Sequence, residues 1–296
     1  MAGRRCRMKW PHVALTVLLV AGLAGTSSVY FLGSRLIEPR LQSVGKPPAA
    51  LRSKAVVIER AGRPSIAGWY GGSGDAKSAV LLLHSVRANR REMIERAEFL
   101  VVAGYAVLLV DLQAHGETTG EHIGFGYTES RDVVDAVAFL RTRHESVGVI
   151  GASMGGAAAI LASKDLNVEA LVAEAVFNDI STAVENRLRI YLGSLGPYMA
   201  PLLLWQLEPR TGISVEAISP ARAVRDLGAP LLVIAGESDE RTTLPDSREL
   251  FDNAGQPKSL WVVPGARHQD FHELLGTEYE NRVLQFFDRH LRVKAT

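Results

Sequence analysis

Short, continuous apolar runs alternate with helix-like segments along most of this chain, and that alternation limits the possible folds more than any other feature. The runs lie at residues 79–84, 105–111, 147–152, 170–177, 231–235 and 259–263. Runs so short and so apolar are typical of strands that are buried on both faces. Strands separated by helices at this spacing predict an α/β fold with a doubly wound, mostly parallel sheet.

The remaining segments fit around these strands. Helical patterns occur at residues 91–102, 129–143, 154–162 and 277–291, and two shorter strand patterns lie at 55–59 and 65–70. The chain has 296 residues, of which 47% are hydrophobic, so it can bury the core of one large domain with a short appendage. We therefore expect the folded domain to span residues 54–296.

The N-terminus has the pattern of a membrane or export signal. It opens with four basic residues, Arg4, Arg5, Arg7 and Lys9. The uncharged apolar stretch at 13–32 is about as long as a helix that crosses a bilayer. We expect residues 1–34 to form a basic head and a single-pass transmembrane signal anchor, with the folded domain outside the cytoplasm. The alternative is a signal peptide cleaved near Gly22-Leu23-Ala24, which would make the protein secreted or periplasmic.

Composition indicates a linker and gives no sign of disulfides or of a nucleic-acid partner. Residues 35–53 contain Lys46-Pro47-Pro48 and are expected to form a linker stiffened by its prolines. Cys6 is the only cysteine, so no intramolecular disulfide can form. The net charge of +1 gives no sign of a nucleic-acid partner, which would favour a basic field.

A Gly-x-Ser-x-Gly pattern lies where one apolar run ends and a small-residue helix begins, at Gly151-Ala152-Ser153-Met154-Gly155. The pattern alone is a weak signal, but this strand-turn-helix setting is typical of a nucleophile elbow. We predict Ser153 as the nucleophile and the amide of Met154 as one oxyanion-hole donor. The structural alternative is a glycine-rich turn that carries a bystander serine.

The base that would activate Ser153 should follow a late strand, because such enzymes carry the order Ser, acid, His along the chain. His268 stands in the turn after the run at 259–263 and is the predicted base. His272, four residues on, is the alternative. The histidine takes the serine proton, since a serine hydroxyl is a poor nucleophile unaided.

The acid should lie in the loop after the preceding strand, at 231–235. Asp239 is the predicted acid, and the alternatives are Glu237, Glu240 and Asp270. A carboxylate in this place fixes the tautomer of the histidine and stabilises its imidazolium form.

The loop at His84-Ser85-Val86 ends the first apolar run, on the side where ligands bind in such sheets. The second oxyanion donor is expected from this loop, as the amide of Val86. We expect His84 to orient the loop, and Asp111 and His115 to tie neighbouring loops by hydrogen bonds.

Together these residues resemble the α/β-hydrolase superfamily over about residues 55–291. The loop from His84-Ser85-Val86 to Asn89-Arg90 is similar to the family's His-Gly oxyanion loop, and residues 111–117 are similar to its Asp-x-x-x-x-Gly loop. The elbow, and the segment 230–239 with His268, match the nucleophile, acid and base. The pattern most resembles Bem46-like and serine-aminopeptidase-like members, often esterases, thioesterases or lipases with an N-terminal membrane segment. The resemblance implies no metal and no organic cofactor.

Two features qualify the resemblance. Ser85 stands where the family usually has glycine, so its side chain could narrow the oxyanion loop or add a hydroxyl donor. Residues 178–216 correspond to the insertion that usually forms a helical cap, and the part at 191–205 is very apolar. This part is read either as a cap helix packed on the core, or as an acyl-chain pocket or membrane-facing lid.

The favoured function is hydrolysis of a carboxylic ester or thioester, possible substrates being small-molecule or lipid-like esters. Peptide or amide cleavage by the same triad is an alternative, because pocket shape chooses the leaving group. An inactive, membrane-tethered binding protein on the same fold is another, because fold alone does not establish chemistry.

Overall fold

The computed structural model describes residues 10–292, apart from the side chains of residues 10–12, 17–18 and 21–24. In this part of the chain, an eight-stranded sheet has the order β10-β9-β8-β7-β4-β5-β3-β2. Its strands are β2 (Lys54–Ile58), β3 (Ile66–Gly71), β4 (Ser78–Leu83), β5 (Ala106–Val110), β7 (Ser146–Ala152), β8 (Ala170–Glu174), β9 (Leu231–Gly236) and β10 (Lys258–Val263).

The strand directions confirm the predicted α/β fold with a mostly parallel sheet. From β10 through β9, β8, β7 and β4 to β5, every pair of neighbours is parallel. Only β3 and β2 at the far edge pair in the antiparallel sense. The carboxyl ends of β4, β7, β9 and β10 therefore meet at one edge of the sheet, which is the edge where the predicted site residues follow their strands.

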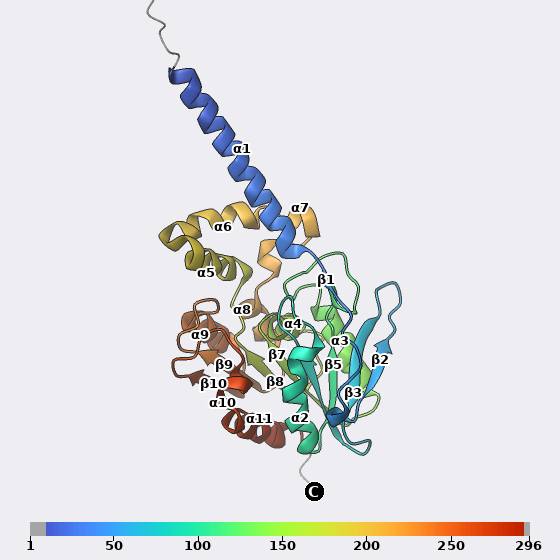
Figure 1. The fold of residues 1–296 in the computed structure, drawn as a ribbon. Helices are drawn as coiled ribbons and strands as arrows, with labels where there is room; N and C mark the ends of the chain where they lie inside the picture. The colour runs from blue at the N-terminus through green and yellow to red at the C-terminus, as the bar shows by residue number, and fades with distance from the viewer. Residues whose placement is uncertain (1–9, 293–296) are drawn as a thin grey trace, which may run out of the picture.

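Helices cover both faces of the sheet because each central strand sends alternate side chains to opposite sides (Figure 1). Leu81 and Leu83 of β4 join the core on the side of α3 (Ser130–Arg141) and α4 (Met154–Leu161). Val80 and Leu82 join the core on the other side. That side carries α2 (Ile94–Val102), which begins after the 3-10 turn η2 (Arg90–Met93), and α10 (Phe271–Leu275) and α11 (Thr277–His290).

The chain between β8 and β9 rises above the carboxyl edge of the sheet as a group of short helices (Figure 1). These are α5 (Ile180–Leu192), η3 (Gly193–Leu195), α6 (Gly196–Leu204), α7 (Leu207–Thr211) and η4 (Val215–Ala217). They occupy the segment where the sequence predicts a cap. Their outer side is unusually apolar, since Tyr198 and Trp205 are 80% and 78% exposed. The chain returns to the sheet through α8 (Pro220–Ala223) and η5 (Val224–Asp226), and α9 (Leu244–Asn253) follows β9.

The N-terminal helix α1 (Trp10–Ile37) extends away from the domain, and its last turns lie beside the cap helices (Figure 1). Gln206 donates a hydrogen bond to the carbonyl of Val29, and Arg210 donates to the carbonyl of Tyr30 at 2.9 Å. The predicted basic head at residues 1–9 lies outside the described residues. Among the described residues, no helix combines the length and apolarity that a membrane span requires, so the predicted single-pass anchor is not supported.

The segment expected as a linker, residues 35–53, lies against the domain instead of bridging to it. Its β1 (Arg40–Leu41) pairs in parallel with β6 (His115–Gly116), and η1 (Ala49–Leu51) follows. Val44 and Leu51 are buried in the core. Backbone pairing and apolar burial hold this segment. The prolines on which the linker prediction was based indicate neither interaction.

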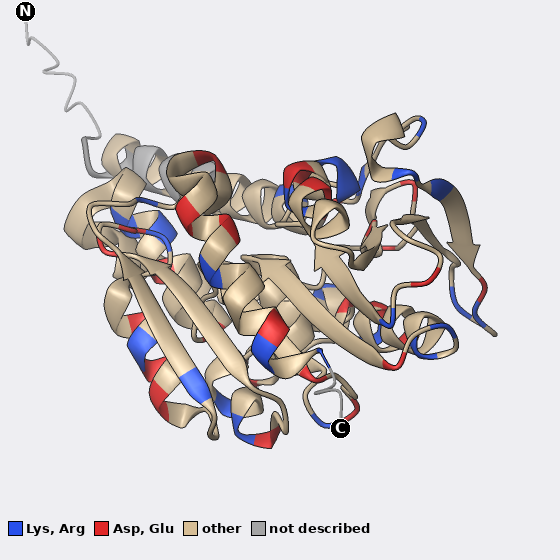
Figure 2. Cartoon of the chain, turned by 90° about the horizontal axis from the view of Figure 1, so that it is seen from below, with Lys and Arg blue, Asp and Glu red and all other residues tan. Residues whose placement is uncertain are grey.

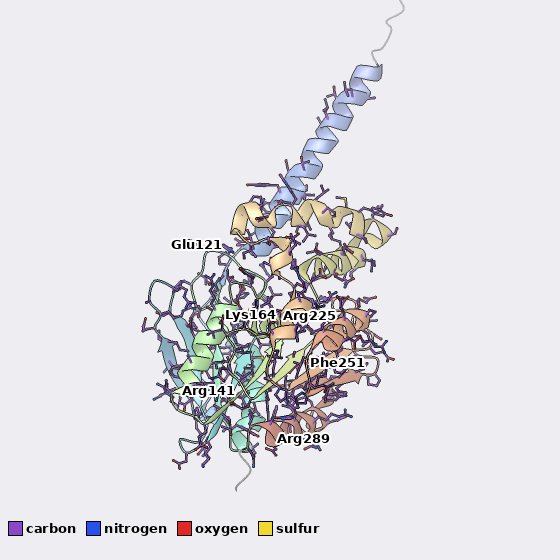
Figure 3. The ribbon with its side chains drawn as sticks, turned by 180° about the vertical axis from the view of Figure 1, so that it is seen from behind. Glu121, Arg141, Lys164, Arg225, Phe251 and Arg289 are labelled. Atoms are coloured by element: carbon purple, nitrogen blue, oxygen red, sulfur yellow. The ribbon has the colours of Figure 1, made fainter. Side chains whose placement is uncertain are left out.

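Charged side chains lie mainly on the helices and loops around the sheet, while the strands are largely uncharged (Figure 2). Lys164 and Arg289, both labelled in Figure 3, are exposed, whereas the labelled Arg141 is partly buried and pairs with Glu169. This distribution is expected of a sheet that is buried on both faces.

Two neighbouring aromatic residues of α11 test this packing. Phe287 is fully buried against the sheet, whereas Phe286 is only partly buried. We predict that Phe287→Ala lowers the free energy of unfolding by about 3–5 kcal/mol, because it leaves a cavity in the core. Phe286→Ala serves as the matched control and should cost clearly less. Chemical denaturation measures both, and equal losses would contradict this packing.

Candidate active site

Ser153 stands in a strained turn between β7 and α4. Its backbone has φ 48° and ψ −110°, a conformation that residues with a side chain rarely adopt. The Ser153 amide donates a 2.7 Å hydrogen bond to the carbonyl of Glu174 at the end of β8, and its carbonyl accepts from Ala157. The turn is thus held from the neighbouring strand and from the helix that it starts.

Glycines make this turn possible by leaving room for the backbone around it. A Cβ at Gly151 would lie 2.5 Å from the backbone of Gly156. A Cβ at Gly155 would lie 2.5 Å from the carbonyl oxygen of Leu83 and 2.7 Å from that of His84. Any side chain at either glycine would push α4 away from β4 or β7. The two glycines of the sequence pattern therefore leave the space that the turn and α4 occupy.

Asp239 and His268 meet beyond the ends of β9 and β10. His268 Nδ1 lies 2.8 Å from Asp239 Oδ2, and the Asp239 carboxylate is buried. Asp239 Oδ1 also accepts hydrogen bonds from the amides of Arg241 and Thr242, and Oδ2 accepts from the Thr242 hydroxyl at 2.7 Å. Burial alone would raise the pKa of Asp239, but the hydrogen bonds from His268 and Thr242 and the charge of His268 outweigh it, so the pKa is lowered.

The alternative residues from the sequence have other partners. His272 contacts Glu95 at 3.3 Å and Glu280 at 3.0 Å, and its ring stacks on Phe99. Asp270 accepts hydrogen bonds from Arg96 and from the first amides of α10. Neither residue contacts the Asp239–His268 pair.

The two remaining acid alternatives also stand apart from His268. The Glu237 carboxylate accepts a hydrogen bond from the amide of Gly265, and Glu240 is exposed. In the described part of the chain, Asp239 is the carboxylate that contacts His268, and no hydrogen bond joins His268 to Ser153. Catalytic hydrogen bonds are often long in structures without substrate.

Arg96 connects the segments that carry the nucleophile and the histidine. It is buried and donates to both carboxylate oxygens of Glu174, at 3.2 and 2.7 Å. It also donates to Asp270, two residues after His268, at 2.8 and 2.9 Å. Since the carbonyl of Glu174 holds the Ser153 amide, Arg96 fixes the two halves of the site relative to each other.

Val86 and Met154 line the same cavity as Ser153, where the sequence expects oxyanion donors. The Met154 amide belongs to the first turn of α4, whose amides have no partner within the helix. The Val86 amide has no hydrogen-bond acceptor among the described residues. The side chain of Ser85 turns to Glu92 of η2, which accepts hydrogen bonds from both its hydroxyl and its amide. Ser85 therefore clamps the loop and does not point its hydroxyl into the cavity.

His84 and Asp111 hold the loops around this cavity. His84 Nδ1 donates to the Ser85 carbonyl at 2.8 Å, and its Nε2 accepts from the Leu112 amide at 3.0 Å. Burial lowers the pKa of His84 to about 4, so the ring is neutral, as these bonds require. Asp111 accepts from the amide and the guanidinium of Arg90 and from the amide of Glu117.

His115 packs its ring edge against the ring of His84, 5.1 Å away between centroids. Its Nδ1 lies 2.9 Å from the carbonyl of Gln113, a contact within its own loop. Burial, followed by the nearness of His84, lowers the pKa of His115 to about 4. The His115 side chain therefore has a packing role, and the hydrogen bond to a neighbouring loop that the sequence predicted for it is absent among the described residues.

Glu129 holds the loop on the other side of the cavity. Its buried carboxylate accepts hydrogen bonds from the amides of Gly124 and Gly126, at 2.8 and 2.9 Å. This fixes Phe125, whose side chain lines the cavity. Burial raises the pKa of Glu129 to about 7, although the backbone hydrogen bonds oppose the shift.

The cavity in front of Ser153 has a volume of about 450 Å³ and lies between the domain, the cap and α1. Its walls are mostly apolar and include Leu36 of α1, Phe177 after β8 and Leu188 of α5. The last turns of α1 are thus part of the site, which the sequence did not predict. A cavity of this size fits a small-molecule or acyl-chain ligand.

The sequence reasoning also missed Thr242 and Glu92, which support the predicted residues. Thr242 follows Asp239 by three residues, so its amide and hydroxyl reach back to the carboxylate. An Asp-x-x-Thr spacing after a strand is the signal that could have indicated it. Glu92 contacts Ser85 from seven residues away, and no pattern in the sequence indicates that contact.

A comparison with known families decides the classification. The model of the "Alpha/beta hydrolase family" matches residues 80–278, more than half of the chain. The chain belongs to the alpha/beta hydrolase family. This alpha/beta hydrolase is similar to proteins from two bacteria and from humans. It is 28% identical over 302 residues to the uncharacterized protein Rv2307c of Mycobacterium tuberculosis, covering 97% of each chain.

Two further relatives are more distant in coverage or identity. YqkD of Bacillus subtilis, also an uncharacterized protein, is 23% identical over 244 residues, 80% of each chain. The human protein ABHD12B is 26% identical over 217 residues, 68% of this hydrolase and 58% of its own length.

Solved structures show the same fold. The Pyrococcus furiosus esterase Pf2001 superposes with a TM-score of 0.73 at 22% identity, covering 87% of this hydrolase and 99% of the esterase. The alpha/beta hydrolase GrgF from Penicillium superposes with a TM-score of 0.64 at 18% identity, covering 80% and 98% of the two chains. At these identities the likeness concerns the fold alone.

The elbow glycines give a direct test of the Ser153 turn. We predict that Gly155→Ala disrupts it, because the new Cβ would collide with the backbone of Leu83 and His84. Covalent labelling of the protein by a fluorophosphonate should fall at least about tenfold or be lost with the fold. Gly74→Ala is the matched control, since its Cβ would meet no atom within 4 Å. Unchanged labelling and stability in Gly155→Ala would contradict the geometry.

Glu129 predicts a pH-dependent stability difference. Its pKa is about 7 in the folded protein against an ordinary value of 4.5, so the folded state binds more protons between these values. The unfolding free energy of the wild type, minus that of Glu129→Gln, should therefore fall by roughly 3 kcal/mol as the pH rises from 4.5 to 7. Urea unfolding across this pH range measures the difference.

The control for this pH profile is Glu121→Gln. Glu121 lies on an exposed loop below α1 (Figure 3). Its wild-type-minus-variant difference should stay flat over the same range. If the difference for Glu129→Gln also stayed flat, this would contradict a raised pKa for the buried Glu129 carboxyl.

Proposed function

We propose that this protein is a serine hydrolase that cleaves carboxylic ester or thioester bonds through Ser153, His268 and Asp239. The observation that carries the proposal is the buried Asp239–His268 pair, 2.8 Å apart, at the same sheet edge as the strained Ser153 turn. The esterase named among the structures of the same fold supports this class of reaction.

In the proposed mechanism, His268 Nε2 takes the proton of the Ser153 hydroxyl while the Ser153 oxygen attacks the substrate carbonyl. The amides of Val86 and Met154 donate hydrogen bonds to the oxyanion that develops. His268 then gives its proton to the departing alcohol or thiol, which leaves the acyl group on Ser153. Water, deprotonated by His268, attacks this acyl-enzyme, and His268 then gives the proton to the Ser153 oxygen as the acid is released.

The hydrogen bonds of Asp239 support the role of the acid. A histidine that donates from Nδ1 to a carboxylate presents Nε2 to the serine in the accepting form. The donors from Arg241 and Thr242 stabilise the ionised carboxylate that this role needs.

The apolar cavity favours lipid-like or other apolar ester substrates. Its walls combine aliphatic and aromatic side chains from the domain, the cap and α1, such as Leu36, Phe125 and Leu188. The finer resemblance, to Bem46-like or serine-aminopeptidase-like proteins, stays a prediction, as does a location outside the cytoplasm. Within this proposal an acyl chain occupies the apolar walls while its carbonyl lies at Ser153.

Substitution of the nucleophile tests the proposal. We expect Ser153→Ala to lower kcat/KM for p-nitrophenyl octanoate by about 10⁴-fold or more, because no acyl-enzyme can form. The control is Ser194→Ala, an exposed serine of the cap, which should retain wild-type turnover. Wild-type turnover in Ser153→Ala would exclude this mechanism. Absence of turnover by the native protein on a full ester and thioester panel would favour the inactive binding protein.

The acid and the base are tested by paired variants. His268→Ala and Asp239→Asn should each lower kcat/KM by about 10³-fold or more, because the serine loses its proton acceptor or that acceptor takes the wrong tautomer. His272→Ala and Glu240→Gln are the matched controls and should stay within a few fold. The assignment is wrong if His272→Ala or Glu240→Gln loses activity while His268→Ala or Asp239→Asn, respectively, keeps it. Unfolding curves exclude loss through misfolding.

A further inference from the structure

The charged residues that line the cavity are all arginines. Arg87, Arg187, Arg210 and Arg241 reach it, whereas no Asp or Glu is among the described lining residues. An apolar cavity that contains several cations and no carboxylate has an uncompensated positive charge. A neutral acyl group would not interact favourably with this positive charge.

Two of these arginines have structural partners. Arg87 donates to the carbonyl of Arg35 at 2.9 Å. Arg210 donates to the hydroxyl of Ser34 and the carbonyl of Tyr30, and its guanidinium lies over the Tyr30 ring. Both therefore hold the end of α1 over the cavity, and their head groups are already engaged.

Arg187 and Arg241 differ from them. Among the described residues, neither guanidinium has a hydrogen-bond acceptor or an ion-pair partner. Asp239 lies near Arg187, but its two oxygens already accept from His268, Thr242 and the Arg241 amide. The acid is thus satisfied without either guanidinium.

The fold holds the two arginines close together. The Arg241 amide is fixed on Asp239, and Arg187 follows Asn186 on α5. Asn186 Nδ2 donates to Asp246 at 2.9 Å and lies 3.4 Å from the Arg241 carbonyl, which ties α5 to this loop. Burial and the charge of the nearby Arg241 lower the pKa of Arg187, and they outweigh the opposing effects of Tyr191 and Asp239.

We propose that Arg187 and Arg241 bind an anionic group of the substrate, so that the enzyme prefers esters carrying a carboxylate or a phosphate over neutral esters of equal length. This inference rests on the proposed function, because it names the substrate class of the same site. Two adjacent guanidinium groups can hold one carboxylate or phosphate through several charge-assisted hydrogen bonds. The apolar walls then contact the hydrocarbon part of the same molecule.

Binding to a protein that cannot react tests this inference. In the Ser153→Ala background, isothermal titration should give octanoate and octyl phosphate dissociation constants at least about tenfold below that of octanol. Arg187→Gln and Arg241→Gln should each weaken the anions about tenfold and leave octanol unchanged. Arg189→Gln, two residues along α5 and outside the cavity lining, is the control and should change neither. The tighter of the two anions identifies the group that is recognised.

Turnover by the native enzyme gives a second readout. The ratio of kcat/KM for mono-p-nitrophenyl suberate to that for p-nitrophenyl octanoate should exceed one and fall about tenfold in Arg187→Gln or Arg241→Gln. Equal binding of anions and octanol, or ratios unaffected by both substitutions, would overturn the inference. Failure of Ser153→Ala to lose activity would instead overturn the proposed mechanism, because anion binding does not depend on acylation.

Discussion

The backbone strain at Ser153 is the constraint that orders the rest of the site. A residue at φ 48° and ψ −110° persists only where its surroundings over-determine it, since such strain costs on the order of 1–3 kcal/mol. Here the carbonyl of Glu174 binds the Ser153 amide, and α4 packs so closely on β4 and β7 that only glycines fit beside the turn. Parallel strands and an attached helix thus fix a hydroxyl at the carboxyl edge of the sheet.

A buried charge network holds this strained turn in register with the histidine. Arg96 joins Glu174, whose carbonyl holds Ser153, to Asp270, which follows His268. A buried ion pair adds little net stability, but removing one partner leaves an uncompensated charge and costs several kcal/mol. The network therefore contributes geometry more than stability, since it keeps the loop after β10 at a fixed distance from β8.

Much of this arrangement could be predicted from local patterns. The apolar runs located the central strands to within a few residues, and the Ser153 turn was visible because strand, glycines and helix are contiguous in the chain. Asp239 and His268 could be chosen because chain order restricts them to two loops. Their hydrogen bond agrees with that choice, while their catalytic roles stay a proposal.

Other features depend on contacts that no local pattern contains. The contact of Glu92 with Ser85 and the packing of residues 35–53 on the domain arise from tertiary structure. The same holds for Arg187 and Arg241, which come from the cap and from the loop after β9 and meet only in the fold. The helix α9 was also missed, although its capping box at Thr243 and Asp246 is a local signal.

The cap and the end of α1 complete a site that the sheet only begins. The sheet edge carries the proposed reacting groups, while the cap and α1 add apolar walls, and the cap adds two of the four lining arginines, Arg187 and Arg210. The most direct test of the central claim is mass spectrometry of the native protein after reaction with a fluorophosphonate. The account predicts one adduct, on Ser153, which is lost in His268→Ala. No adduct, or an adduct on another residue, would contradict it.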